Sequence, residues 1–228
     1  MPAFERHQRF GAGGRRTVTF GAAAHPYDHL LDDYEPGLTT AEVRFLLDGL
    51  RTRQVALLKA IRSRPQVDDA MLREEYTEHG MLDFSVEVMT AFGFDWTRGR
   101  QDKSAHPFCA GTGPDDVRVT TRWVPALPLG LVTGSMHETG HALYEAGLPR
   151  NWRRQPVGLA RGMVLHESQS LLMEMQACRS DAFIAFAAPR MREAFGKDGP
   201  AWTADNIHRL YTRVEPGFIR VDADEVTY

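Results

Sequence analysis

The segment His137-Glu138-Thr139-Gly140-His141 constrains this chain more than any other part of its sequence. In an α-helix, side chains four residues apart lie on one face with Cβ atoms about 5–6 Å apart, so both histidines can reach one metal ion. A catalytic zinc site usually has three protein ligands and an open position for water. Glu138 would lie beside that position and accept a proton from the water. The segment therefore predicts a helix that carries two zinc ligands and a general base.

The motif is specific for a chain of this composition. With 9 histidines in 228 residues, a random chain would contain about 0.02 such segments. The alternative, two unrelated histidines on an ordinary helix, is therefore disfavoured. The flanking sequence is compatible with a helix on both sides, which agrees with the metal-binding interpretation.

A third ligand is needed, and the candidates downstream are His166, Glu167 and Glu174. Glu167 is favoured, because a carboxylate from a second helix completes the two-histidine, one-glutamate set of thermolysin-like enzymes. Adjacent helical residues point about 100° apart, so only one of His166 and Glu167 can face the metal. His166 is then either the rival ligand, a support for a ligand, or a substrate contact. The same set of ligands also suits Co²⁺ or Mn²⁺.

Composition excludes several other classes of protein. A net charge of −3 and a pI near 6.3 give no basic surface for nucleic acid or for an acidic membrane. No apolar run approaches the roughly 18 residues of a membrane span, and the first residues do not resemble a signal peptide. Cys109 and Cys178 have no metal-binding spacing and are expected to be buried, inert thiols. We expect a cytoplasmic protein.

Hydrophobic periodicity predicts a mostly helical fold with a minor β element. Residues 1–24 are rich in Gly and Arg and are expected to be a poorly ordered lead-in. Thr39 and Glu42 form a capping-box signature at the start of a long amphipathic helix that ends near Pro65. The other predicted helices cover 81–92, 132–146, 162–187 and 203–215, and alternation predicts a short strand over 117–121.

Several motifs together resemble the carboxypeptidase Taq family of zinc metallocarboxypeptidases. They are Tyr27 to Gly37, His106-Pro107-Phe108, Asp116 to Thr120, His137 to His141, His166 to Gln169 and Ile219 to Asp224. The resemblance covers residues 27–228 and implies a thermolysin-like helical core with a small antiparallel β element, within a larger all-helical cleft fold. By position it implies His137, His141 and Glu167 as metal ligands and Glu138 as general base.

The resemblance also implies a function and an assembly. Such proteins are cytoplasmic homodimers that remove residues one at a time from peptide C-termini with broad specificity. Family members are about twice this length, so residues 25–228 are expected to be part of a catalytic domain that lacks the N-terminal helices and the C-terminal portion. The alternatives are a catalytically incomplete zinc-binding fragment or oligomerisation module, and a thermolysin-type endopeptidase.

An exopeptidase needs a cation for the free carboxylate of its substrate, and the planar arginine fork suits this role. Arg118, Arg122 and Arg220 are candidates, and the resemblance favours Arg220. Asp116 and Arg118 alternate on the predicted strand, so this pair either orients a substrate or, the favoured reading, braces the zinc helix. His106 precedes a proline and is expected either to face the substrate or to belong to an anchoring loop.

Overall fold

The computed structural model describes residues 23–64, 69, 74–125 and 128–214. Most of the predicted lead-in and the motif that contains Arg220 lie outside the described residues. The chain divides into two compact units, one of 1–64 with 161–165, the other of 65–160 with 166–228. Among the described residues, none of the helices has both the length and the apolar content needed to cross a bilayer.

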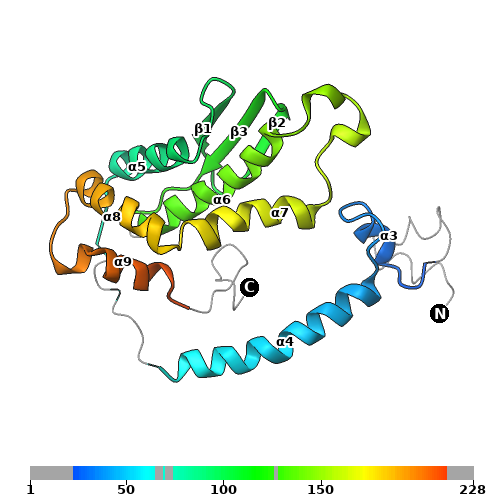
Figure 1. The fold of residues 1–228 in the computed structure, drawn as a ribbon, viewed down its shortest axis with the longest axis horizontal. Coiled ribbons are helices and arrows are strands. Elements are labelled where there is room, and N and C mark those ends of the chain that lie inside the picture. Colours follow the sequence, from blue (N-terminus) through cyan, green and yellow to red (C-terminus); the bar gives the residue numbers. More distant parts are fainter. Residues whose placement is uncertain (1–22, 65–68, 70–73, 126–127, 215–228) are drawn as a thin grey trace. The chain divides into compact units, whose positions relative to one another are not determined.

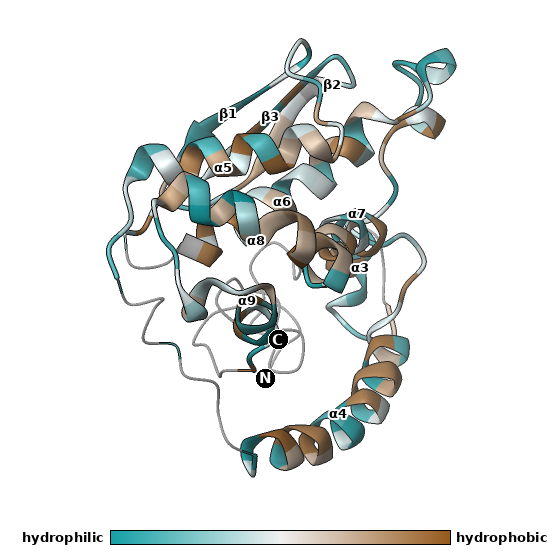
Figure 2. Cartoon of the chain, turned by 60° about the vertical axis from the view of Figure 1, so that its left-hand side comes forward, coloured by the Kyte–Doolittle hydropathy of each residue, from teal (hydrophilic) through white to brown (hydrophobic). Residues whose placement is uncertain are grey.

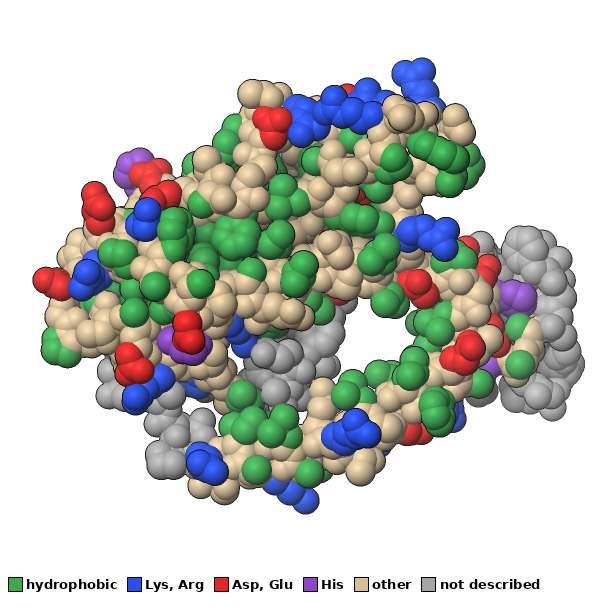
Figure 3. Space-filling view, in the orientation of Figure 1, with side chains coloured by type: hydrophobic (Ala, Val, Ile, Leu, Met, Phe, Trp, Pro, Cys, Tyr) green, Lys and Arg blue, Asp and Glu red, His purple; other side chains and the backbone are tan. Residues whose placement is uncertain are grey.

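The first unit contains α3 (Asp28–Leu31) and α4 (Thr40–Arg62). The predicted capping box is confirmed, because the Thr39 hydroxyl accepts from the Glu42 N–H while the Glu42 side chain accepts from the Thr39 N–H at 2.9 Å. Apolar and polar residues alternate along α4 (Figure 2). None of its side chains is buried within the described residues, and apolar ones are visible along its surface in Figure 3.

The same unit holds the start of α7. The Glu35 carboxylate accepts a hydrogen bond from the N–H of Val164 at 2.8 Å, and the Tyr34 carbonyl accepts from Met163 at 2.7 Å. A negative group at a helix N-terminus satisfies free N–H groups and is favoured by the helix dipole. The acidic segment that ends in Glu35 therefore fixes where α7 begins.

The second unit builds its core around a small sheet and the helices beside it (Figure 1). Its elements are α5 (Glu78–Ala91), β1 (Gly99–Lys103), β2 (Cys109–Gly113), β3 (Asp116–Thr121), α6 (Pro128–Ala146), α7 (Met163–Leu171), a π-helical turn (Leu172–Ala177), α8 (Asp181–Phe195), α9 (Ala204–Tyr211) and three short 3₁₀ turns. The first three residues of α7 group with the other unit.

The sheet has the order β1-β3-β2, and β3 packs against α6. Val117 and Val119 of β3 are buried, together with Leu131, Val132 and Met136 of α6. The antiparallel expectation is confirmed for β2 and β3 but is wrong for β1, which pairs parallel to β3. The tight connection between β2 and β3 makes them an antiparallel hairpin, and β1 lies at the other edge of β3 and runs in the same direction as β3.

The predicted helix over 162–187 is wrong as one unbroken helix. The Cys178 N–H bonds to the Met173 carbonyl five residues back, which closes the π turn, and Ser180 then caps α8 by accepting from the Phe183 N–H. A capping serine competes with helix continuation. At its other end, α8 continues through Pro189, and the burial of Ala187, Ala188 and Met191 around it offsets a cost of about 3 kcal/mol for proline in a helix.

Candidate metal centre

Helix α6 carries the predicted motif on the side that faces α7. His141 is buried, and the side chain of His137 is 18% exposed. The centroids of the two rings lie 4.9 Å apart. Glu138 is buried as well, with 6% of its surface exposed. The helical spacing thus places two imidazoles and one carboxylate together, as the sequence predicts.

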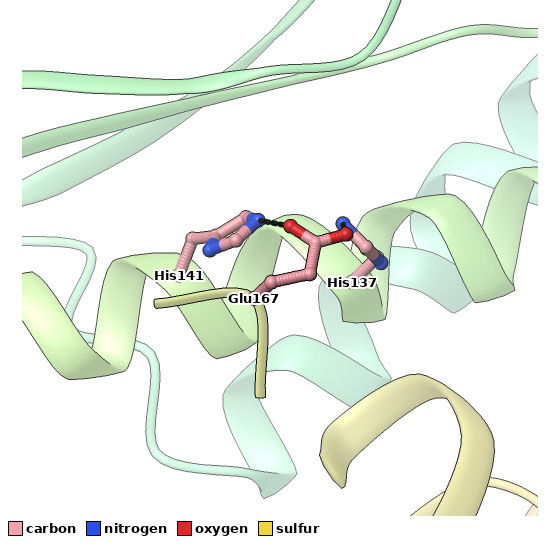
Figure 4. A group of neighbouring side chains, drawn as sticks. All are labelled: His137, His141 and Glu167. Carbon is pink, nitrogen blue, oxygen red and sulfur yellow. Dashed lines mark ion pairs between the residues drawn. The ribbon is translucent and has the colours of Figure 1, made fainter. Parts of the chain in front are cut away.

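Glu167 reaches both histidines from α7 (Figure 4). One carboxylate oxygen lies 3.7 Å from Nε2 of His137, and the other lies 3.5 Å from Nε2 of His141. These three residues each offer a ligand atom within 4.8 Å of the others. Ligands about 2 Å from a tetrahedral zinc ion stand about 3.4 Å apart, so the donor set fits such an ion.

His137 is held on its other side by Glu174. The Nδ1 atom of His137 lies 2.8 Å from a Glu174 carboxylate oxygen, so Nδ1 carries the proton and Nε2 is left free to bind a metal. Burial alone would lower the pKa of His137, but the hydrogen bond and charge of Glu174 outweigh it and raise that pKa. Glu174 lies in the π turn, an irregularity that often marks functional sites. The third-ligand candidate Glu174 therefore contacts Nδ1 of His137 and is not in the group of three possible donors.

Glu138 lies in a setting that disfavours its charged form. Burial raises the pKa of its carboxyl, and the neighbouring histidines His137, His141 and His106 offset this only in part. A carboxyl whose pKa is moved toward neutrality is suited to accept and return a proton. His106 thus lies near enough to Glu138 to act on its charge.

The loop that carries His106 is tied to the sheet by side-chain hydrogen bonds. The Thr120 hydroxyl accepts from the Phe108 N–H at 3.0 Å, and the Ser104 hydroxyl donates to the His106 carbonyl at 2.5 Å. Ser104 and Thr120 also bond to each other at 2.7 Å. His106 itself is exposed. These hydrogen bonds anchor the loop to the sheet, and the His106 imidazole is accessible.

Arg118 does not brace α6. Its guanidinium bonds to both carboxylate oxygens of Asp116 at 2.9 and 3.1 Å, and 55% of the side chain is exposed. Because side chains alternate along a strand, Arg118 lies on the face opposite Val117 and Val119, which face the core. The pairing of Asp116 with Arg118 is confirmed, but the bracing role is wrong.

The two cysteine thiols are shielded from reaction. Cys178 is buried and Cys109 of β2 is partly buried, and burial raises the pKa of each to about 12. The thiolate is the reactive form. We therefore expect iodoacetamide at pH 8 to alkylate both residues in the urea-unfolded chain and neither in the folded chain over the same time, as read by mass spectrometry. Equal rates in the two states would contradict this.

A mainly helical fold in which two helices bring two histidines and a glutamate together beside a buried glutamate is the arrangement typical of metallopeptidases of the HExxH class. Within that class, the chain belongs to the carboxypeptidase Taq (M32) metallopeptidase family, whose model matches residues 14–228. The resemblance drawn from the motifs is thereby confirmed.

Individual relatives agree with this assignment. The chain is 40% identical over 203 residues to thermostable carboxypeptidase 1 of Thermus thermophilus, covering 89% of this chain and 40% of that protein. It matches the M32 carboxypeptidase structure from Deinococcus radiodurans R1 with a TM-score of 0.90 at 31% identity, covering 98% of this chain and 45% of that one. A Trypanosoma cruzi metallocarboxypeptidase 1 structure gives a TM-score of 0.84 at 36% identity, covering 99% and 50%. The chain spans about two fifths of the length of the curated relatives it matches.

Proposed function

We propose that this chain carries the catalytic centre of a zinc-dependent metallocarboxypeptidase, which hydrolyses the C-terminal peptide bond of peptides with broad side-chain tolerance. The observation that supports this most directly is the convergence of His137, His141 and Glu167 within 4.8 Å, beside the buried Glu138. Family membership implies a divalent metal, and two histidines with one glutamate are a donor set that catalytic zinc sites use.

In this proposal, His137, His141 and Glu167 hold the metal, and Glu138 moves the proton. A bound zinc ion supplies positive charge that polarises the scissile carbonyl. Glu138 takes a proton from the attacking water and returns it to the leaving amine. Its burial removes competing solvent from the carboxylate, which strengthens its interaction with the proton that it transfers.

The substrate contacts proposed here come from two other parts of the chain. His106 is proposed to face the substrate, which is supported by its exposure and by its effect on Glu138. Arg220, chosen from the family resemblance, is proposed to pair with the free carboxylate of the substrate. His166 is no longer proposed as a substrate contact, because both of its ring nitrogens bond to protein groups.

Two alternatives share these metal ligands. A catalytically incomplete zinc-binding fragment or oligomerisation module would bind metal without cleaving peptides, and an endopeptidase would cut internal bonds. Residues 25–228 are proposed to form part of a catalytic domain. The homodimer and the cytoplasmic location stay predictions.

One experiment separates the three functions. The 228-residue chain, loaded with zinc or with cobalt, is incubated with one peptide as its free acid and as its C-terminal amide, and products are read by mass spectrometry. We expect release of the last residue from the free acid only, and none from the chelator-treated chain. Internal cleavage of both peptides would indicate an endopeptidase, and bound zinc with no cleavage would indicate the incomplete fragment.

A further inference from the structure

Three side chains form a row behind the second histidine of the motif. The Nδ1 atom of His141 lies 2.7 Å from Nδ1 of His166, and Nε2 of His166 lies 2.8 Å from a Glu145 carboxylate oxygen. His141 and Glu145 are four residues apart on α6, so they lie on the same face. His166 enters between them from α7, directly before Glu167. The row thus joins the two helices that carry the metal ligands.

If both imidazoles are neutral, only one assignment of donors and acceptors satisfies both hydrogen bonds of this row. The Glu145 carboxylate can only accept, so Nε2 of His166 carries a proton and donates it. Nδ1 of His166 is then an acceptor, which requires Nδ1 of His141 to be the donor. His141 is therefore left with a free lone pair on Nε2, the atom that faces Glu167 at 3.5 Å.

Packing fixes the rings that make these bonds. The side chains of His141 and His166 are only 11% and 16% exposed. Tyr144 meets the His166 ring edge to face at 5.0 Å between centroids, an arrangement that aromatic rings prefer. The carboxylate at the outer end, on Glu145, is 31% exposed. The two histidines of the row are therefore shielded from solvent, whereas the Glu145 carboxylate is in contact with it.

We propose that His166 and Glu145 form a positioning relay that holds His141 in the tautomer and orientation required for metal binding. The inference rests on the proposed metal site. The two histidines of the motif are then supported differently: His137 by Glu174 directly, and His141 by a carboxylate that acts through a second imidazole. A group that bonds to a ligating histidine fixes its tautomer and raises its basicity.

The relay is tested with two variants of His166 that differ in whether an acceptor atom faces His141. His166→Asn keeps an acceptor oxygen near the position of Nδ1, whereas His166→Phe keeps a ring and removes the acceptor. We expect His166→Phe to weaken zinc affinity about 10- to 100-fold, the usual range for losing such a support, and His166→Asn to stay within about threefold of the parent chain. Affinity is measured by competition with a chromophoric chelator. His79→Phe, at an exposed histidine on α5, is the control.

A second measurement needs no metal. Long-range proton–nitrogen NMR of the metal-free chain at about pH 8, where free imidazole is neutral, reports which nitrogen of His141 is protonated. We expect Nδ1–H in the parent chain and in His166→Asn, and a mixture of tautomers in His166→Phe. Equal zinc affinities for the two variants, or an Nε2–H tautomer in the parent chain, would overturn the relay. A parent chain that shows the Nδ1–H tautomer but binds no zinc would refute the proposed metal site while supporting the hydrogen-bonded row.

Discussion

Replacing Glu138 by Gln should lower the turnover of the free-acid peptide by about 10²- to 10⁴-fold, the range that a positioned general base contributes. Glutamine keeps the shape of the side chain but cannot take a proton at neutral pH. Glu138 is not one of the three residues grouped as metal donors. Zinc should therefore remain bound at one ion per chain, as read by elemental analysis, while hydrolysis is lost.

The matched control is Glu193→Gln, which makes the same chemical change at an exposed position of α8. It should leave both turnover and zinc content unchanged. If Glu138→Gln retained the activity of the parent chain, Glu138 would not be the base, and the proposed proton transfer would be wrong. Loss of zinc together with activity would instead indicate that the glutamate supports the metal.

Local sequence signals predicted the helices well because their causes are local. The capping box at Thr39 and Glu42 is a property of four consecutive residues, and it sets the start of α4 wherever the helix lies. Strands β1 and β2 were missed because Gly99–Lys103 and Cys109–Gly113 contain few β-branched or aromatic residues. They are strands because they pair with β3, and pairing partners are not encoded in the local pattern.

In the candidate metal site, too, the features set by local sequence were predicted, and those set by packing between segments were not. The two candidate ligands on α6 were predicted from helical spacing, and Glu167 was predicted from the donor set that catalytic zinc sites use. The contacts of Glu174 and Glu145 could not be predicted, because they depend on how α6 lies against residues 166–177. For His166 the sequence left three roles open, one of which was the support of a ligand. Glu167 and Glu174 lie seven residues apart, which places them about 20° apart on one face of a regular helix. Spacing alone could therefore not tell which carboxylate faces Nε2 of His137 and which faces Nδ1, a difference that only the contacts show.

The close approach of α6 and α7 depends on one residue inside the motif, Gly140. A Cβ atom built there would lie 2.4 Å from the Gln169 carbonyl oxygen and 2.6 Å from Cα of Ser170. Both contacts are with backbone, which cannot rotate away as a side chain could. The glycine therefore lets α7 lie close enough for Glu167, two residues before Gln169, to reach the two histidines.

Gly140→Ala should consequently damage both the fold and the metal centre. Alanine favours a helix over glycine by about 1 kcal/mol, but forcing a methyl group into a packed contact typically costs about 1–3 kcal/mol and sometimes more. Pushing α7 outward would also move Glu167 away from His137 and His141. Because both contacts are with backbone, we take the upper end of that cost, so the net loss after the gain in helix propensity is about 2 kcal/mol. We expect the melting temperature to fall by about 4–8 °C, at roughly 2–4 °C per kcal/mol for a chain of this size, and zinc affinity to fall at least about tenfold.

Gly134→Ala is the matched control for this prediction, because it lies in the same helix and a Cβ there would meet only the Pro107 ring, at 3.9 Å. That distance is ordinary van der Waals contact, so the gain in helix propensity should remain. We expect a melting temperature equal to or slightly above that of the parent chain, with zinc affinity unchanged. Differential scanning calorimetry and chelator competition on both variants would measure this contrast. If the two alanine variants behaved alike, the spacing of α6 and α7 would not depend on Gly140, and Glu167 would be held in place by other contacts.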